Sequence, residues 1–153
     1  MEAAILIGIQ GSGKSTFFRE RLSDTHVRIN LDMLRTRHRE KLLFEACLAA
    51  KQSFAVDNMN PTRQDRRRYI PASRAAGFRV VGYYFESDLA ECRKRNEDRP
   101  NGKVIPYGGL LSAFKKLEAP SGDEGFDELH HVKIGPDGQF IVEARLPEHE
   151  RRG

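Results

Sequence analysis

The 153-residue sequence lacks tryptophan and contains only two cysteines, Cys47 and Cys92. These cysteines lie far apart without metal-ligand spacing, so we expect buried thiols in a reducing cytoplasm. No apolar run approaches the roughly 20 residues that span a bilayer. Glu2 and the short apolar run after it do not resemble the basic and long apolar regions of a signal peptide. We therefore expect a cytoplasmic protein with no membrane partner.

The five histidines show no ligand spacing, and none is expected to bind metal or to take part in catalysis. The sequence also lacks internal repeats, low-complexity tracts and linker-like stretches. A chain of this length is most simply one domain, which we expect over residues 1–146, with a flexible tail over residues 147–153.

Residues 8–15 form a complete G-x-x-x-x-G-K-[ST] phosphate-binding loop, which directly follows the apolar run 3–7. In such a loop backbone N–H groups surround a phosphate, Lys14 reaches the β- and γ-phosphates, and the Ser15 hydroxyl binds Mg²⁺. A helix that begins after the loop directs its positive end at the same anion. The motif predicts a nucleoside triphosphate but does not say what becomes of its γ-phosphate.

The rest of the chain alternates between strand and helix patterns, which predicts an α/β fold with a mostly parallel central sheet flanked by helices. The strands are expected over residues 3–8, 27–31, 53–56 and 78–85. The helices are expected over residues 14–22, from Asp32 to about 50, from Pro61 to about 76, 88–98 and 106–117. Residues 129–144 read as a β-hairpin that finishes the domain.

Charge is unevenly distributed along the chain. The net charge is +4, yet residues 118–153 carry nine acids against four bases, so residues 1–117 carry +9. A basic excess beside the phosphate loop is consistent with a polyanionic second substrate, and equally with an ordinary solvated basic surface.

Two carboxylates follow strands that neighbour the phosphate loop. Ligands of open α/β sheets bind at the carboxyl ends of the strands, where Asp32 and Asp57 are expected. Asp32 is placed to act as a general base, and Arg35 would share its helical face and bind an anionic acceptor group. Asp57 could order Mg²⁺ and its waters. The structural alternatives are a helix cap for Asp32 and a turn-forming residue for Asp57.

Arginines are concentrated in two further segments. Arg95 and Arg99 lie four residues apart on one helix face, so residues 92–106 are expected to form a short helical lid over the triphosphate. The second group is either a track for nucleic-acid phosphates or a surface: Arg63, Arg66, Arg67, Arg68 and Arg74. Interleaved acids leave a solvated helix as the alternative for the lid.

The ordered set of these blocks resembles the 5′-hydroxyl polynucleotide kinases, the P-loop kinase modules of phage-type and animal-type end-healing enzymes. The blocks are residues 8–16, Asn30-x-Asp32-x-x-Arg35, Asp57-Asn58-x-Asn60-Pro61 and Arg95-Asn96-x-x-Arg99. Residues 104–106, 114–120 and 124–126 also resemble the animal and bacterial versions. The resemblance covers about residues 3–130.

The resemblance implies an ATP- and Mg²⁺-dependent enzyme that phosphorylates 5′-hydroxyl ends of DNA or RNA during nucleic-acid end healing. It implies a nucleotide site made of Gly11, Ser12, Gly13, Lys14, Ser15, Thr16, Arg95 and Arg99. It makes Asp32 the general base, assisted in catalysis by Lys14 and Arg99. Arg35, Asp57 and Asn58 would lie on the substrate side, and Ser15 would be the metal ligand.

Other readings stay open beside the resemblance. The Asp-x-Asp-x-Thr/Val motif of the associated phosphatase module is missing, so 3′-end processing is not expected and a separate phosphatase or ligase is left open as a partner. A small-metabolite, nucleotide or sugar kinase and an NTPase switch share the same loop, and GTP is an alternative donor. The pairing of Asp32 with Arg35 favours a bound acceptor over a simple switch.

Overall fold

The computed structural model describes residues 1–100 and 103–145, and is built on one six-stranded sheet. The strands are β1 (Glu2–Ile7), β2 (Val27–Ile29), β3 (Phe54–Val56), β4 (Arg79–Phe85), β5 (Glu128–Ile134) and β6 (Phe140–Ala144). Their order is β2-β3-β1-β4-β5-β6, and all neighbours are parallel except β5 and β6. The predicted α/β class and the closing hairpin are confirmed, whereas the expected tail, 147–153, lies outside the described residues.

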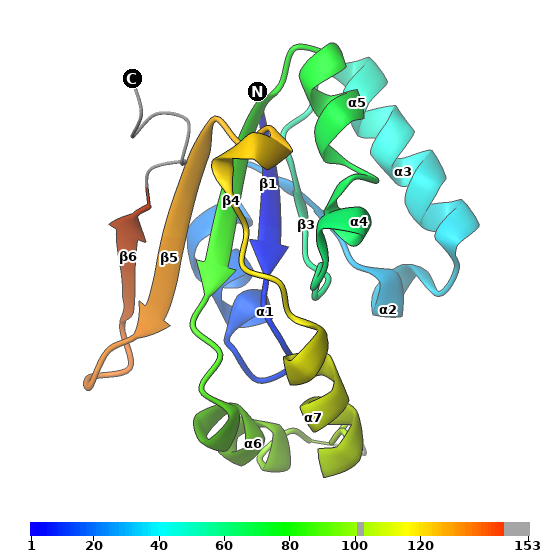
Figure 1. The fold of residues 1–153 in the computed structure, drawn as a ribbon. Coiled ribbons are helices and arrows are strands. Elements are labelled where there is room, and N and C mark those ends of the chain that lie inside the picture. The colour runs from blue at the N-terminus through cyan, green and yellow to red at the C-terminus, as the bar shows by residue number, and fades with distance from the viewer. Residues whose placement is uncertain (101–102, 146–153) are drawn as a thin grey trace.

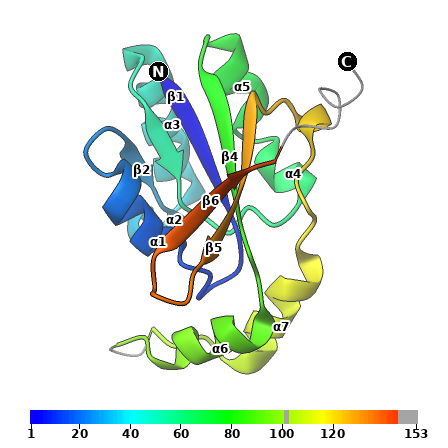
Figure 2. The same ribbon diagram turned by 90° about the vertical axis from the view of Figure 1, so that its left-hand side faces the viewer.

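Helices cover both faces of the sheet (Figure 1). They are α1 (Lys14–Phe17), the π-helical turn η1 (Phe18–Leu22), α2 (Leu31–Leu34), α3 (Arg37–Ala50), α4 (Arg63–Arg66), α5 (Ile70–Ala75), α6 (Leu89–Glu97), α7 (Tyr107–Lys116) and the 3₁₀ turn η2 (Gly122–Glu124). Helices α6 and α7 lie together beyond the carboxyl ends of β1 and β4, as two views at right angles agree (Figures 1 and 2).

Strand β1 forms the centre of the core, because Ala3 to Ile7 are fully buried. Side chains alternate across a strand, so odd-numbered residues such as Ile5 pack with Phe44 of α3 on one face. Even-numbered residues such as Leu6 pack with Phe17 of α1 on the other face. A strand buried on both faces explains the uninterrupted apolar run that precedes the phosphate loop.

The closing hairpin packs against the start of α1. Phe140 of β6 is buried, and its ring lies 5.3 Å from that of Phe17 in an edge-on arrangement. Gly13 adjoins the same ring, because a Cβ added there would lie 3.1 Å from Phe140. The last strand described therefore supports the helix that follows the phosphate loop.

Two of the predicted helices are each broken in two. The expected helix from Asp32 to residue 50 is interrupted at Arg35, whose φ of 77° is left-handed, and Thr36 caps the new helix by accepting from Arg39 N. The expected helix from Pro61 to residue 76 is divided into α4 and α5. The alternative role of Asp32 as a helix cap is also wrong, because Asn30 is the N-cap of α2 and its side chain accepts from Met33 N at 2.9 Å.

The proposed arginine track is largely used inside the fold. Arg66 is fully buried, and its guanidinium donates to both carboxylate oxygens of Glu124 at 2.7 and 3.0 Å. Arg63 pairs with Asp123 and Arg74 with Asp127, each at 3.0 Å. Only Arg67 and Arg68 of this group are exposed without a side-chain partner among the described residues. The acidic segment near residue 124 thus neutralises part of the basic excess that suggested a polyanionic substrate.

We expect Arg66→Met to destabilise the protein by about 3–5 kcal/mol, because it leaves the nearly buried Glu124 carboxylate without its partner. Arg67→Met changes the exposed neighbouring residue, and its free energy of unfolding should stay within about 0.5 kcal/mol of that of the unaltered protein. Urea unfolding followed by circular dichroism measures both. Equal unfolding midpoints for the two variants would contradict a stabilising role for the buried pair.

Candidate functional site: a phosphate loop bordered by carboxylates and a helical lid

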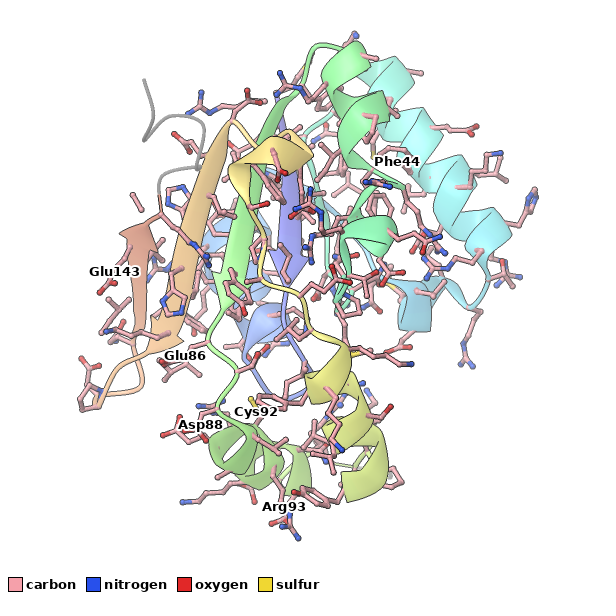
Figure 3. The ribbon with its side chains drawn as sticks, in the orientation of Figure 1. Phe44, Glu86, Asp88, Cys92, Arg93 and Glu143 are labelled. Carbon is pink, nitrogen blue, oxygen red and sulfur yellow. The ribbon has the colours of Figure 1, made fainter. Side chains whose placement is uncertain are left out.

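The phosphate loop links β1 to α1 at the carboxyl edge of the sheet. Gly11 and Gly13 adopt left-handed backbone conformations, with φ of 81° and 101°. A side chain at Gly11 would collide with the carbonyl oxygen of Cys92, so α6 lies directly on the loop. Cys92 is on the side of α6 that faces the loop (Figure 3). The glycine spacing thus serves both the turn and the close approach of α6.

Lys14 is buried within its own loop. Its Nζ donates to the carbonyl oxygens of Gly8 at 2.8 Å and Ile9 at 3.0 Å. Burial lowers the pKa of Lys14 to about 8, against the opposing electrostatic effects of Asp57, Cys92 and, least of the three, Asp32. Arg99 lowers this pKa further, so its charge also acts on the ammonium. The fold therefore brings the charges of three predicted site residues to bear on Lys14.

Asp57 follows β3 and lies beside the loop. Its Oδ2 accepts from Ser15 Oγ at 3.0 Å and from Arg28 Nε at 2.8 Å, and its side chain is 1% exposed. Arg28 Nη2 also donates to Ser15 Oγ at 3.1 Å. Sequence reasoning missed Arg28. The signal was a charged residue in the middle of a short parallel strand, where apolar residues are the rule.

The donors beside the loop suit a hard cation. Ser15 offers a hydroxyl and Asp57 a carboxylate, and Mg²⁺ takes oxygen ligands and keeps several waters and phosphate oxygens of its own. No group of three or more His, Cys, Asp or Glu residues with metal-site geometry occurs in the described ranges 1–100 and 103–145. The residues present therefore fit a metal that arrives with a phosphate ligand better than a metal held by protein alone.

Two asparagines hold the helix that carries Asp32. Asn30 Nδ2 donates to Asp57 O at 2.7 Å, and Asn58 Oδ1 accepts from Leu31 N at 2.9 Å. Asn58 Nδ2 donates to the buried Glu40 at 2.9 Å, so this predicted substrate-side residue is built into the scaffold.

Glu40 is the centre of this polar network. It accepts from Tyr69 Oη at 2.9 Å and from Arg37 at 2.8 Å. Burial and the nearby Glu40 carboxylate raise the pKa of Tyr69 to about 12, so the phenol stays a donor. The network fixes α2 and α3 against the end of β3.

Asp32 and Arg35 are both exposed at the end of the sheet. Asp32 lies in the first turn of α2, with its side chain free of the capping role that Asn30 fills. Arg35 is the C-cap of α2, with a φ of 77°, so it lies outside the regular helix that carries Asp32. The expectation of a common helix face assumed an unbroken helix, which the structure does not have at Arg35.

Helix α6, part of the expected lid, is tied to the loop by Arg95 and to the segment before α7 by Asn96. Arg95 Nη1 donates to Gly11 O at 2.6 Å, and Nη2 donates to Glu91 at 3.2 Å. Asn96, which is buried, joins both backbone groups of Ile105, with Nδ2 donating to the carbonyl at 2.7 Å and Oδ1 accepting from the amide at 3.0 Å. Residues 101–102 of the expected lid lie outside the described residues.

The segment before the lid also carries acids. Glu86 and Asp88 lie between β4 and α6 (Figure 3). Asp88 caps α6 by accepting from Glu91 N at 3.1 Å. An N-cap carboxylate is favourable at the positive end of a helix, so Asp88 has a structural role.

Comparison with known proteins identifies the family. A family model described as an AAA domain matches residues 4–106. The chain belongs to this AAA-domain family. Within the part of the chain that the structure describes, none of the helices is long and apolar enough to cross a membrane.

A bifunctional polynucleotide phosphatase/kinase of Schizosaccharomyces pombe is 28% identical over 136 residues, which cover 86% of this chain and 33% of that protein. The chain thus spans about a third of the length of this curated relative. A gluconokinase from Sinorhizobium meliloti 1021 has a TM-score of 0.62 at 17% identity, and the match covers 88% of this chain and 83% of the gluconokinase chain. Chaetomium thermophilum Kti12, solved with ADP-AlF3, has a TM-score of 0.62 at 15% identity, covering 89% and 92%.

These comparisons show an AAA-domain protein whose fold is that of P-loop kinases. The structural likenesses lie below 20% identity and show the fold alone. The gluconokinase is named for a sugar acid and the Schizosaccharomyces pombe relative for a polynucleotide, so the acceptor of this protein has to be argued from its own residues.

We expect nucleotide affinity to fall as the pH rises above 8. Burial holds the pKa of Lys14 near 8 in the free protein, and a bound phosphate stabilises the charged ammonium and raises that pKa. The complex therefore takes up a proton, and the dissociation constant should rise by up to about tenfold per pH unit above 8. Calorimetric titrations from pH 7 to 9.5, in buffers of different ionisation enthalpy, measure both effects.

Lys14→Arg provides the control, because a guanidinium stays protonated throughout this range. The variant should bind nucleotide without pH-dependent proton uptake. A flat affinity profile for the unaltered protein would contradict the role given to Lys14.

Proposed function

We propose that the protein transfers the γ-phosphate of ATP to the 5′-hydroxyl end of DNA or RNA, in nucleic-acid end healing. The observation that carries the proposal is the exposed carboxylate of Asp32 in the first turn of α2, which Asn30 and Asn58 fasten to the end of β3 next to the phosphate loop. The order of the sequence blocks and the Schizosaccharomyces pombe relative support the polynucleotide acceptor. Two buried free thiols are in keeping with a cytoplasmic location.

On the donor side, the loop from Gly11 to Thr16 would hold the ATP phosphates with its backbone N–H groups. Lys14 would exchange its two carbonyl partners for phosphate oxygens. These anionic oxygens would restore the stabilisation of the charged ammonium that burial removes. Arg95 is already fixed on the loop, and Arg99 acts electrostatically on Lys14. Both arginines would neutralise charge that develops on the transferred group.

Ser15 and Asp57 would hold Mg²⁺ on the phosphates, Ser15 as a ligand and Asp57 as the acid that orders the ligand and its waters. When bound, the metal neutralises phosphate charge and orients the γ-phosphate. This assignment moves Asp57 from the acceptor to the metal side of the site.

On the acceptor side, Asp32 would take the proton of the 5′-hydroxyl while the hydroxyl oxygen attacks the γ-phosphorus and ADP leaves. Asn58 and Asn30 hold the first turn of α2, so the base has a fixed position while its own carboxylate oxygens take no part in capping the helix. Arg35 would bind the phosphate next to the reacting end. Because both Asp32 and Arg35 are exposed, the acceptor can be a long chain.

We expect Asp32→Asn to lower kcat by about 10²–10⁴-fold with ATP affinity nearly unchanged, because only the proton acceptor is lost. Rates come from labelling a 5′-hydroxyl oligonucleotide with γ-labelled ATP, and affinity comes from calorimetry. Asp24→Asn, at another exposed aspartate, should keep full activity. An Asp32→Asn variant as active as Asp24→Asn would remove Asp32 from the base role.

We expect 5′-hydroxyl DNA or RNA to be labelled, while 5′-phosphorylated oligonucleotides, gluconate and other sugars are not. Polyanion binding also predicts that acceptor affinity falls steeply with salt, whereas a neutral sugar would show little salt dependence. Parallel labelling reactions at 50 and 200 mM salt test both points. Labelling of a small metabolite with no labelling of any oligonucleotide would overturn the proposed acceptor.

A further inference from the structure

Arg28 is the middle residue of β2, and its side chain lies between the phosphate loop and the residue that follows β3. Its guanidinium donates through Nε to Asp57 Oδ2 at 2.8 Å and through Nη2 to Ser15 Oγ at 3.1 Å. Ser15 Oγ in turn donates to the same Asp57 oxygen at 3.0 Å. The three side chains form a closed triangle around the two oxygen donors that suit Mg²⁺.

The strand dictates this placement. Val27 and Ile29 pack with the apolar cluster on the α3 face of the sheet, so Arg28 between them is directed to the α1 face. The Arg28 side chain is 31% exposed, whereas that of Asp57 is 1% exposed. Arg28 can therefore swing towards solvent or a ligand, while the Asp57 carboxylate stays buried and needs a cation beside it.

We propose that Arg28 is a built-in counter-ion that excludes free Mg²⁺ from Ser15 and Asp57, and that it gives way only when a nucleoside triphosphate is bound. This inference rests on the nucleotide-and-metal half of the proposed function and makes no use of the acceptor. It assigns Arg28 a positioning role, in which metal binding becomes conditional on nucleotide.

The physical basis is competition between cations. A guanidinium and a divalent ion cannot both lie within hydrogen-bond or ligand distance of the same two oxygens without strong repulsion in a partly buried site. Without nucleotide, Arg28 already neutralises Asp57, and a lone metal gains little by displacing it. A bound triphosphate supplies new anionic oxygens for both Arg28 and the metal, which removes the conflict.

Mn²⁺ binding in the absence of nucleotide tests this directly, because the electron-spin-resonance signal of free Mn²⁺ reports binding without any turnover. We expect Arg28→Gln to bind Mn²⁺ at least tenfold more tightly than the unaltered protein. Adding Asp57→Asn to this variant should abolish the gain. With a saturating non-hydrolysable ATP analogue, the two proteins should differ by less than threefold.

Arg67→Gln is the matched control, since it removes one charge from an exposed residue outside the triangle. Its Mn²⁺ affinity should change by less than twofold, because distant exposed charges are screened. A structural defect in Arg28→Gln would weaken Mn²⁺ binding, whereas the inference requires it to strengthen. Unchanged or weaker binding, or an equal gain in Arg67→Gln, would overturn the inference.

If Arg28→Gln does not fold, nuclear magnetic resonance on the unaltered protein tests the inference. The Arg28 Nε–H resonance, assigned by its loss in Arg28→Lys, should shift on addition of Mg²⁺ with the ATP analogue and stay in place with Mg²⁺ alone. A shift caused by Mg²⁺ alone, or no shift in either case, would overturn the inference. Because no acceptor is present, failure of 5′-end labelling would leave these results intact.

Discussion

Asp57 is the point on which the candidate site depends. Its backbone N–H donates to Ile29 O at 2.8 Å, its carbonyl oxygen accepts from Asn30, and its carboxylate accepts from Ser15 and Arg28. One residue thus ties the end of β2, the start of α2 and the phosphate loop to the end of β3. A buried carboxylate requires such compensation, and here the compensating groups belong to the elements that carry the chemistry.

In the block Asp57-Asn58-x-Asn60-Pro61, which contributes to the resemblance, the two asparagines act as structure. Asn58 and Asn60 follow Asp57, and both spend their side chains inside the protein. Asn60 has a left-handed φ of 47° and donates to Leu6 O at 2.7 Å, while the adjacent Met59 O accepts from Gly8 N at 3.0 Å. The turn after β3 therefore fastens the end of β1 at the point where the loop begins. Precise placement of a few reacting groups needs this supporting layer.

The sequence predicted the features that local pattern controls. The apolar run, the glycine spacing of the loop and the alternation of strands and helices predicted the sheet and the edge at which the phosphate loop lies, because strand ends and loop sequences are short-range properties. The break at Arg35 escaped prediction, since neither glycine nor proline marks it and Thr36 provides the new cap. The pairing of Arg66 with Glu124 joins residues 58 positions apart, so no local pattern could reveal it. Arg28 carried a local signal, a charged residue in a short strand, but its partners Ser15 and Asp57 lie elsewhere in the chain, so its role follows only from the folded structure.

The packing of Phe140 against Gly13 and Phe17 has a consequence for the order in which the protein matures. The loop precedes the strand that covers its helix by more than 120 residues in the chain. A nascent chain would therefore carry its complete phosphate motif long before the surrounding support exists. Competence to hold a nucleotide would arise only when β6 emerges and pairs with β5.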